Sequence, residues 1–315
     1  MKISGFTFVK NATKLYFPVR QSILSVLPMV DEFVVALGKS DDDDDTLAEI
    51  QRINSDKIKI VHVEWDTEKY PKNTIFAQQT DLAKEVCTGD WLFYMQSDEA
   101  IHEQWLPQLK ELCETYLDDK RVDGFLFQYK HFWGDYKHYH QNHVWYPKEI
   151  RIIRNDKKIH SWRDAQSFRK FETFDYSYED YMSKAGKKLN VVEVPAEIFH
   201  YGYVRPPRVM GKKSKSNIET FSGKENAAEF YKKNAYFDYG PMDQLPIFQG
   251  AHPAAMQDWI DDFHWQDDLR QSGPLTGEQK HDRLKYRVIS WFENHVFGKQ
   301  LWGFRNYNII KSVKF

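Results

Sequence analysis

The sequence has little cysteine, no long apolar run and almost no net charge, and each shortage excludes a class of protein. Its 2 cysteines in 315 residues form no CxxC pair, so a disulfide framework is excluded and a reducing, cytoplasmic location is expected. No segment approaches the roughly 18 apolar residues of a membrane span, and residues 1–17 show no signal-peptide pattern. The formal net charge of -2 creates no overall field for nucleic acid, so no nucleic-acid partner is expected.

Aromatic residues, by contrast, are plentiful. They make up 16% of the chain, with 10 Trp and 18 Tyr. Tyr and Trp combine an apolar face with a polar tip, which suits ligands such as sugars that have both apolar faces and hydroxyl groups. The composition therefore favours a soluble protein that binds a polar ligand with apolar faces.

Strand-like and helix-like segments alternate over the first 130 residues. The short apolar strands read as buried on both faces, which is typical of a mostly parallel sheet flanked by helices. After about residue 225 the chain becomes amphipathic and helical, so we expect an α/β domain at 1–225 and a helical C-terminal extension at 226–315. The predicted strands are 2–11, 31–38, 57–65, 90–95 and 122–133, and the predicted helices between them are 19–30, 46–54, 73–87 and 103–117.

The apolar strand at 90–95 ends directly at polar residues. Gln96 and Ser97 are followed by two acids, Asp98 and Glu99. Ligands of open parallel sheets bind outside the carboxyl ends of the strands, where a carboxylate can hold Mg²⁺ or Mn²⁺ through its hard oxygen atoms. The alternative is that Asp98 only caps the segment that follows. A second acidic tract, 41–45, has the same two interpretations, a helix cap or a ligand contact.

Three segments, in this order, carry a resemblance to a known family. Segment 31–50 has an apolar run leading to Gly, Ser, Asp and Thr, segment 77–99 has a helix, a glycine turn, a strand and acids, and segment 179–207 has Glu-Asp, Gly-Lys-Lys, a strand and a His. Across about residues 1–215 the chain resembles the family-two inverting glycosyltransferases of GT-A fold. The resemblance implies an α/β fold and a nucleotide-diphosphate sugar, UDP- or GDP-linked, as donor.

The resemblance also implies roles for single residues. Asp98 matches the last acid of the family's DxD motif and His200 a histidine that completes the metal shell, so both are expected to bind Mn²⁺ or Mg²⁺. A hydrogen-bonded histidine at a strand end is the alternative for His200. Gln96 departs from the first acid of the motif, and its amide brings a hydrogen bond but no charge. The residues expected at the donor are Phe8, Gly38, Gln79, Asp81, Gln96, Ser97, Arg205, Arg208 and Lys212.

Inversion at a sugar carbon needs a base that takes the proton of the acceptor hydroxyl. Asp180, beside Glu179, matches the family's Glu-Asp motif and is the first candidate, while Asp164, in the loop after a strand, is the rival. The aromatic and histidine-rich stretch 131–147 is expected to bind the acceptor, a saccharide or glycolipid. A zinc site in that stretch is the alternative. The expected acceptor platforms are Trp133, Tyr136 and Trp145.

The sequence thus predicts a metal-dependent glycosyltransferase of polysaccharide biosynthesis. A catalytically inactive carbohydrate- or nucleotide-binding protein is one rival, because Gln96 replaces an acid. A nucleotidyltransferase is another, although residues 6–17 lack the Gly-rich basic loop that it would need. In the tail, Trp291, Phe292, Phe297 and Trp302 recur among basic residues, which favours either a helix on the inner membrane surface or a packing face.

Overall fold

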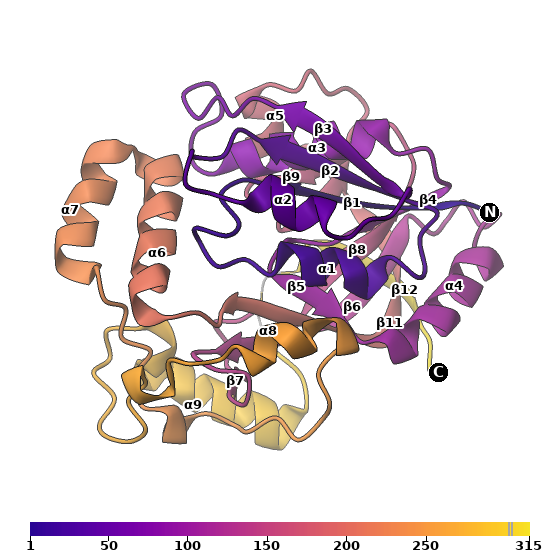
Figure 1. Cartoon of the computed structure of the whole chain (residues 1–315). Coiled ribbons are helices and arrows are strands. Elements are labelled where there is room, and N and C mark those ends of the chain that lie inside the picture. The colour runs from indigo at the N-terminus through magenta and orange to yellow at the C-terminus, as the bar shows by residue number, and fades with distance from the viewer. Residues whose placement is uncertain (302, 304) are drawn as a thin grey trace.

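One curved sheet with helices on its faces organises the computed structural model, which describes residues 1–301, 303 and 305–315 (Figure 1). Its strand order is β3-β2-β1-β4-β8-β6-β11-β10-β9, and β12 and β5 pair with β11 while β7 pairs with β6. The strands are β1 Ile3–Val9, β2 Glu32–Gly38, β3 Ile58–Val63, β4 Trp91–Tyr94, β5 Glu99–Ile101, β6 Gly124–Trp133, β7 Tyr139–His140, β8 Lys148–Arg154, β9 Ile159–Trp162, β10 Ser167–Lys170, β11 Lys187–Tyr203 and β12 Tyr307–Ser312.

The first half of the sheet is parallel, as the sequence predicts. Strands β3, β2, β1 and β4 pair in parallel, and the side chains of β2 alternate between two cores. Phe33 and Val35 pack in the core that α1 and α4 cover, whereas Val34 and Ala36 pack in the core that α3 covers. Antiparallel pairing begins at β8. The predicted α/β fold class, a sheet flanked by helices, is confirmed.

The helices lie between the strands of the sheet and in the second half of the chain. None among the described residues is long and apolar enough to cross a membrane. The α-helices are α1 Val19–Val26, α2 Thr46–Gln51, α3 Thr74–Val86, α4 Leu106–Thr115, α5 Tyr178–Met182, α6 Pro207–Ser222, α7 Lys224–Asn234, α8 Gln257–Asp261 and α9 Leu284–Phe292.

The segment 226–315 is helical only in part. After α9 and a π-helical turn at Glu293–Phe297, the chain returns to the sheet as β12, which pairs in parallel with β11. The last residues thus depart from the expected helical extension, because the free edge of β11 supplies backbone partners that local periodicity does not reveal. The predicted tail residue Trp302 lies outside the described residues.

A third core, made mostly of aromatic residues, joins the hairpin of β6 and β7 to segment 239–269. Trp133 and Tyr136 are buried in it, and the Trp133 indole donates a hydrogen bond to the Tyr239 carbonyl at 2.8 Å. The predicted role of these two residues as acceptor platforms is not met, because their side chains are enclosed. The abundance of aromatic residues is thus explained in part by packing.

Candidate active site

A cavity of about 880 Å³ opens beside the carboxyl ends of β1 and β4. Such a volume lies within the range of small-molecule sites. Its walls come from the turn after β4, the loop 164–166, the end of β11 and the helix α6, which stands apart from the sheet in Figure 1. Among the predicted residues, the cavity is lined by Phe8, Gln96, Ser97, Asp98, Trp145, Asp164, His200 and Lys212.

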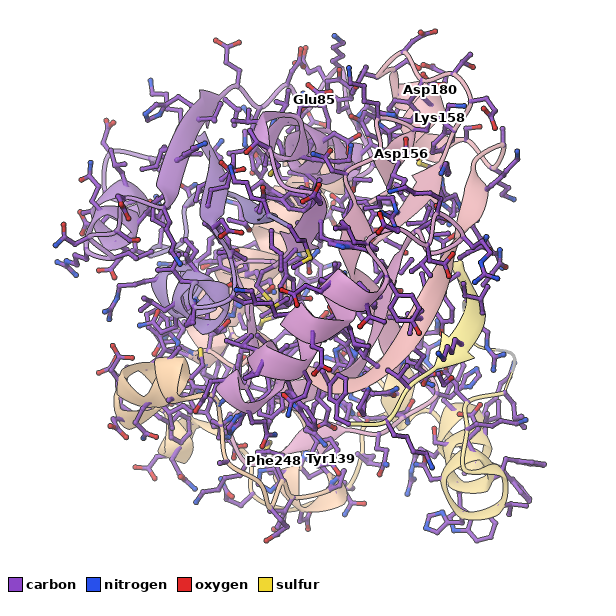
Figure 2. All side chains as sticks on the ribbon, turned by 90° about the vertical axis from the view of Figure 1, so that its right-hand side faces the viewer. Glu85, Tyr139, Asp156, Lys158, Asp180 and Phe248 are labelled. Carbon is purple, nitrogen blue, oxygen red and sulfur yellow. The ribbon has the colours of Figure 1, made fainter. Side chains whose placement is uncertain are left out.

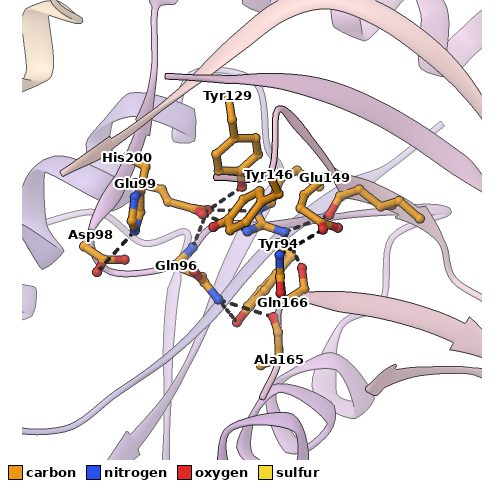
Figure 3. A network of polar contacts seen from close by, with 12 residues as sticks. Tyr94, Gln96, Asp98, Glu99, Tyr129, Tyr146, Glu149, Ala165, Gln166 and His200 are labelled. Atoms are coloured by element: carbon orange, nitrogen blue, oxygen red, sulfur yellow. Dashed lines mark hydrogen bonds and ion pairs between the residues drawn. The ribbon is translucent and has the colours of Figure 1, made fainter. Parts of the chain in front are cut away.

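The two acids after β4 have separate roles. Glu99 is fully buried and forms a bidentate ion pair with Arg151, at 2.8 and 2.7 Å. The Tyr129 hydroxyl donates a further hydrogen bond to Glu99 at 2.7 Å. Of these two acids, only Asp98 lines the cavity. Glu99 thus fixes the strand end, and Asp98 is the acid left for a ligand (Figure 3).

Asp98 is surrounded by positive charge. Lys213 Nζ lies 3.3 Å from its Oδ2 and donates to the Gly202 carbonyl at 2.6 Å. Burial by itself raises the pKa of Asp98, but the surrounding basic groups, Lys213 first among them, outweigh it and hold the pKa at about 2. Burial, followed by the Arg205 charge, lowers the pKa of Lys213 to about 7. Asp98 is therefore an ionised acceptor at neutral pH.

His200 is oriented by a chain of hydrogen bonds that ends at a carbonyl. The Tyr146 carbonyl can only accept, so His131 donates to it through Nε2 at 2.8 Å. Burial lowers the pKa of His131 well below its usual range, so its Nδ1 keeps a lone pair and accepts from His200 Nδ1 at 3.0 Å. His200 Nε2 is then unprotonated and lies 3.8 Å from Asp98 Oδ2. This is the tautomer that binds a metal.

Gly202 leaves room for the side chains of Asp98 and His200 because it has no Cβ. A Cβ at this position would lie 2.4 Å from His200 Nε2 and 2.8 Å from Asp98 Oδ2. In the sequence, His131 stands out only as one histidine of the stretch 131–147, and Gly202 carries no signal of its own. Only the pairing of β6 with β11, which sets His131 opposite His200, reveals their connection to Asp98.

Gln96 reaches across the cavity floor to the loop that carries Asp164. Its Nε2 donates to the Ala165 carbonyl at 3.2 Å and to the Tyr94 hydroxyl at 3.3 Å (Figure 3). A carboxylate could not donate to that carbonyl. The amide at position 96 therefore connects the turn after β4 to the loop 163–166.

That loop holds Asp164 in a strained backbone. The residues on either side, Arg163 and Ala165, have φ of 58° and 62°, a conformation that costs L-residues energy and clusters at functional sites. Asp164 has an exposed side chain on the cavity wall, and its partial removal from water raises its pKa above the usual range. A carboxylate with a raised pKa is a better base.

An aromatic wall closes the side of the cavity near β1. Phe8 stacks on Phe76 with ring centroids 5.7 Å apart, and Trp65 packs against Phe8 at 5.9 Å. Lys10 lies over the Trp65 ring. A Cβ at Gly38 would meet Trp65 Nε1 at 2.3 Å, so Gly38 acts through Trp65. The sequence gives no signal for these two residues. Trp65 follows β3 and Phe76 lies in the first turn of α3, and neither belongs to a recognisable motif.

Several predicted residues lie away from the cavity. Gln79 donates to the Glu64 carbonyl, and Asp81 accepts from the Ser161 amide and the Tyr181 hydroxyl. Both are buried behind the wall, so they are in structural positions.

Of the predicted basic residues before and within α6, some line the cavity and others lie away from it. Arg205 is fully buried and donates to the Leu15 carbonyl at 2.7 Å, from where its charge still acts on Asp98. Arg208 lies over the Tyr236 ring. Lys212 alone of these three lines the cavity.

Glu179 and Asp180, the two acids of the predicted motif on α5, also lie away from the cavity. Asp180 accepts the Asp175 amide at 2.7 Å and, like Glu179, is not among the cavity-lining residues. Figure 2 shows Asp180 at the upper end of the molecule, whereas Tyr139 and Phe248 lie at the lower end. Of the two candidate bases, Asp164 lines the same cavity as Asp98, and Asp180 does not.

The described residues supply two side chains for a divalent cation. Asp98 Oδ2 and His200 Nε2 lie 3.8 Å apart in the space that Gly202 leaves free, so both fit a hard cation. Across the described part of the chain, no three His, Cys, Asp or Glu side chains gather as a metal cluster. A cation here would need further ligands from phosphate or water.

Comparison with known proteins finds similarity only to solved structures, and only at low identity. No protein-family model and no curated protein matches it. S. aureus TarS is similar over 74% of this chain and 42% of its own, at 14% identity and a TM-score of 0.40. Glucosyl-3-phosphoglycerate synthase from Mycobacterium tuberculosis, with Mn²⁺, UDP and phosphoglyceric acid, is similar over 41% of this chain and 42% of its own, at 18% identity and a TM-score of 0.28.

A shorter TarS structure, residues 1–349 with UDP, is similar over 74% of this chain and 70% of its own, at 14% identity and a TM-score of 0.35. The chain thus spans less than half of the longer TarS chain. Because the TM-scores are low, residue roles rest on the geometry of the cavity itself.

Proposed function

We propose that the chain is a glycosyltransferase that moves a sugar from a nucleotide-diphosphate donor to a hydroxyl acceptor with inversion. The observation that carries the proposal is the convergence of Asp98, His200 and Lys213 at one end of an 880 Å³ cavity that has an aromatic wall. The aromatic wall of Phe8, Trp65 and Phe76 suits a nucleobase, and the cationic end suits a diphosphate.

Charge at the cavity supports an anionic donor. Lys10, Lys212, Lys215 and Lys224 line it, and no ion pair links any of them to an acid among the described residues. Lys14, in contrast, pairs with Asp41 at 2.8 Å, so that part of the acidic tract is already neutralised. Uncompensated lysines beside a cavity lower the energy of a bound diphosphate and of the leaving group.

A divalent cation would be held by Asp98 and His200. When bound, Mn²⁺ or Mg²⁺ stabilises negative charge on the diphosphate that leaves. Arg205, which is buried and acts on Asp98, adds a second positive charge at the same end. The protein thus concentrates positive charge where the leaving group develops its negative charge.

Asp164 is proposed as the base. Its carboxylate takes the proton of the acceptor hydroxyl while that oxygen bonds to the anomeric carbon from the side opposite the diphosphate. One such displacement inverts the carbon. Gln96 holds the loop through Ala165, and Trp145, on the same cavity, offers an apolar face for the acceptor sugar.

The test is release of UDP from UDP-sugars, with acceptor panels, in the presence and absence of Mn²⁺. UDP-sugars come first because the structural neighbours were solved with UDP. We expect Asp98→Asn and Asp164→Asn to lower kcat by about 100-fold or more, with the folded state retained. Asp180→Asn is the matched control and should stay within a few-fold of wild type.

Two outcomes contradict the proposal. Binding of UDP-sugars without any transfer or hydrolysis would favour the rival of an inactive binding protein. Release of pyrophosphate from a nucleoside triphosphate would favour a nucleotidyltransferase. If Asp180→Asn loses activity and Asp164→Asn does not, the base is assigned to the wrong acid.

A further inference from the structure

Helix α9 and the π-helical turn after it present their apolar side to solvent. Large apolar side chains recur every three or four residues and are 46–72% exposed. Soluble proteins rarely leave such a stripe uncovered unless it binds something. The stripe, here called the α9 stripe, consists of Leu284, Val288, Trp291, Phe292, Val296 and Phe297.

The inner side of this segment is polar, which reverses the usual arrangement of a surface helix. Ser290 Oγ accepts the His143 amide at 2.8 Å, and buried Glu293 pairs with His143 Nδ1 at 2.7 Å. Asn294 donates to the Gln141 carbonyl at 2.8 Å. Polar contacts therefore hold the segment to the loop before β8, and the apolar side is left free. Figure 1 shows α9 along the lower edge of the molecule.

The exposed charged residues within 283–299 all have one sign. Arg283, Lys285, Arg287 and Lys299 are exposed, whereas Glu293, the single acid in 283–299, is buried and paired. A two-fold contact between copies of the chain would bring these like charges together. Aromatic and aliphatic residues flanked by lysine and arginine match an anionic lipid surface.

We propose that the α9 stripe docks the protein onto membranes that contain anionic lipids. The segment lies in the plane of the interface, with Trp291, Phe292 and Phe297 among the acyl chains and headgroups and the cations against the lipid phosphates. No described helix crosses the membrane, so the association is peripheral. The inference does not depend on the proposed function.

The experiment is sedimentation of the full chain with vesicles of phosphatidylcholine alone or mixed with phosphatidylglycerol. We expect binding to the mixed vesicles that weakens with salt. Lys285→Gln combined with Arg287→Gln should lower the partition coefficient about 25-fold at low salt, since each juxtamembrane charge is worth about fivefold. Trp291→Ser combined with Phe292→Ser should lower it by at least about tenfold.

Ile247→Ser is the matched control, because Ile247 is 56% exposed and lies outside the stripe. It should bind like wild type, and circular dichroism checks that every variant is folded. If the aromatic variant does not fold, the charge variant alone decides. Equal binding to both vesicle types, no binding at low salt, or loss of binding by Ile247→Ser would overturn the proposal. So would a wild-type dimer that the aromatic variant dissociates, since a second copy would then cover the stripe.

Discussion

Replacing Gln96 by glutamate tests whether the amide is a weakened metal ligand or a support for the base. The sequence motif alone suggests that an acid at this position would restore metal chemistry. In the structure Gln96 Nε2 is the donor to the Ala165 carbonyl, at 3.2 Å, and to the Tyr94 hydroxyl, at 3.3 Å. Gln96→Glu keeps the length of the side chain and removes that donor.

The expected loss can be estimated from these contacts. A missing neutral hydrogen bond with its carbonyl left unpaired costs about 1–3 kcal/mol, which corresponds to a decrease in Tm of roughly 2–6 °C for a chain of this size. Release of the strained loop would move Asp164. Displacing a catalytic group by about 1 Å costs on the order of 100-fold, so we expect kcat to fall 10–100-fold with little change in donor KM.

The assay is UDP release at saturating donor over a range of Mn²⁺, with thermal unfolding measured in parallel. Tyr94→Phe is the control, because it removes the other partner of Gln96 and leaves the Ala165 contact intact, and it should change kcat by only a few-fold. Higher activity of Gln96→Glu with tighter dependence on Mn²⁺ and unchanged Tm would refute the reasoning. Position 96 would then be a lost metal ligand.

Three further predictions concern the same region. Gly202→Ala should abolish Mn²⁺-dependent stabilisation and transfer, measured by thermal shift and UDP release, because its Cβ would lie 2.4 Å from His200 Nε2. His131→Phe should weaken Mn²⁺ binding 10–100-fold in a titration, since it removes the acceptor that fixes the His200 tautomer. Glu149→Gln should stabilise the protein by about 2–5 kcal/mol at pH 9 and little near pH 4. Burial raises the pKa of Glu149 from 4.5 to about 8, so the wild-type protein loses stability as the pH rises between these values. The free energy of unfolding of both proteins is measured against pH by denaturant titration. The same pH dependence in both would show the reasoning wrong.

Much of the fold was predictable because it follows from local patterns. Buried strands such as β2 read as continuous apolar runs, and the parallel half of the sheet places the end of β4 at the ligand edge. Asp98 could therefore be predicted as the acid at the site. The strand β12 could not, since it forms only where the free edge of β11 provides partners more than 100 residues away in sequence.

The roles of the acids were decided by distant contacts in the same way. Asp98 and Glu99 look alike in sequence, but Arg151, 52 residues from Glu99, removes Glu99 from the site. Asp180 matches the family motif better than Asp164, yet only Asp164 lines the cavity. The partners of Gln96 at Ala165 and of His200 at His131 are also 69 residues away.

The sequence by itself determined the alternating α/β framework and the acid at the end of the fourth strand. These depend on residues close together in the chain, where apolar periodicity and strand ends are visible. Only the tertiary structure decided which carboxylate is free, why position 96 is an amide and which side of α9 faces water. Each of these depends on which distant groups approach within hydrogen-bonding distance, and that is set by the packing of the sheet.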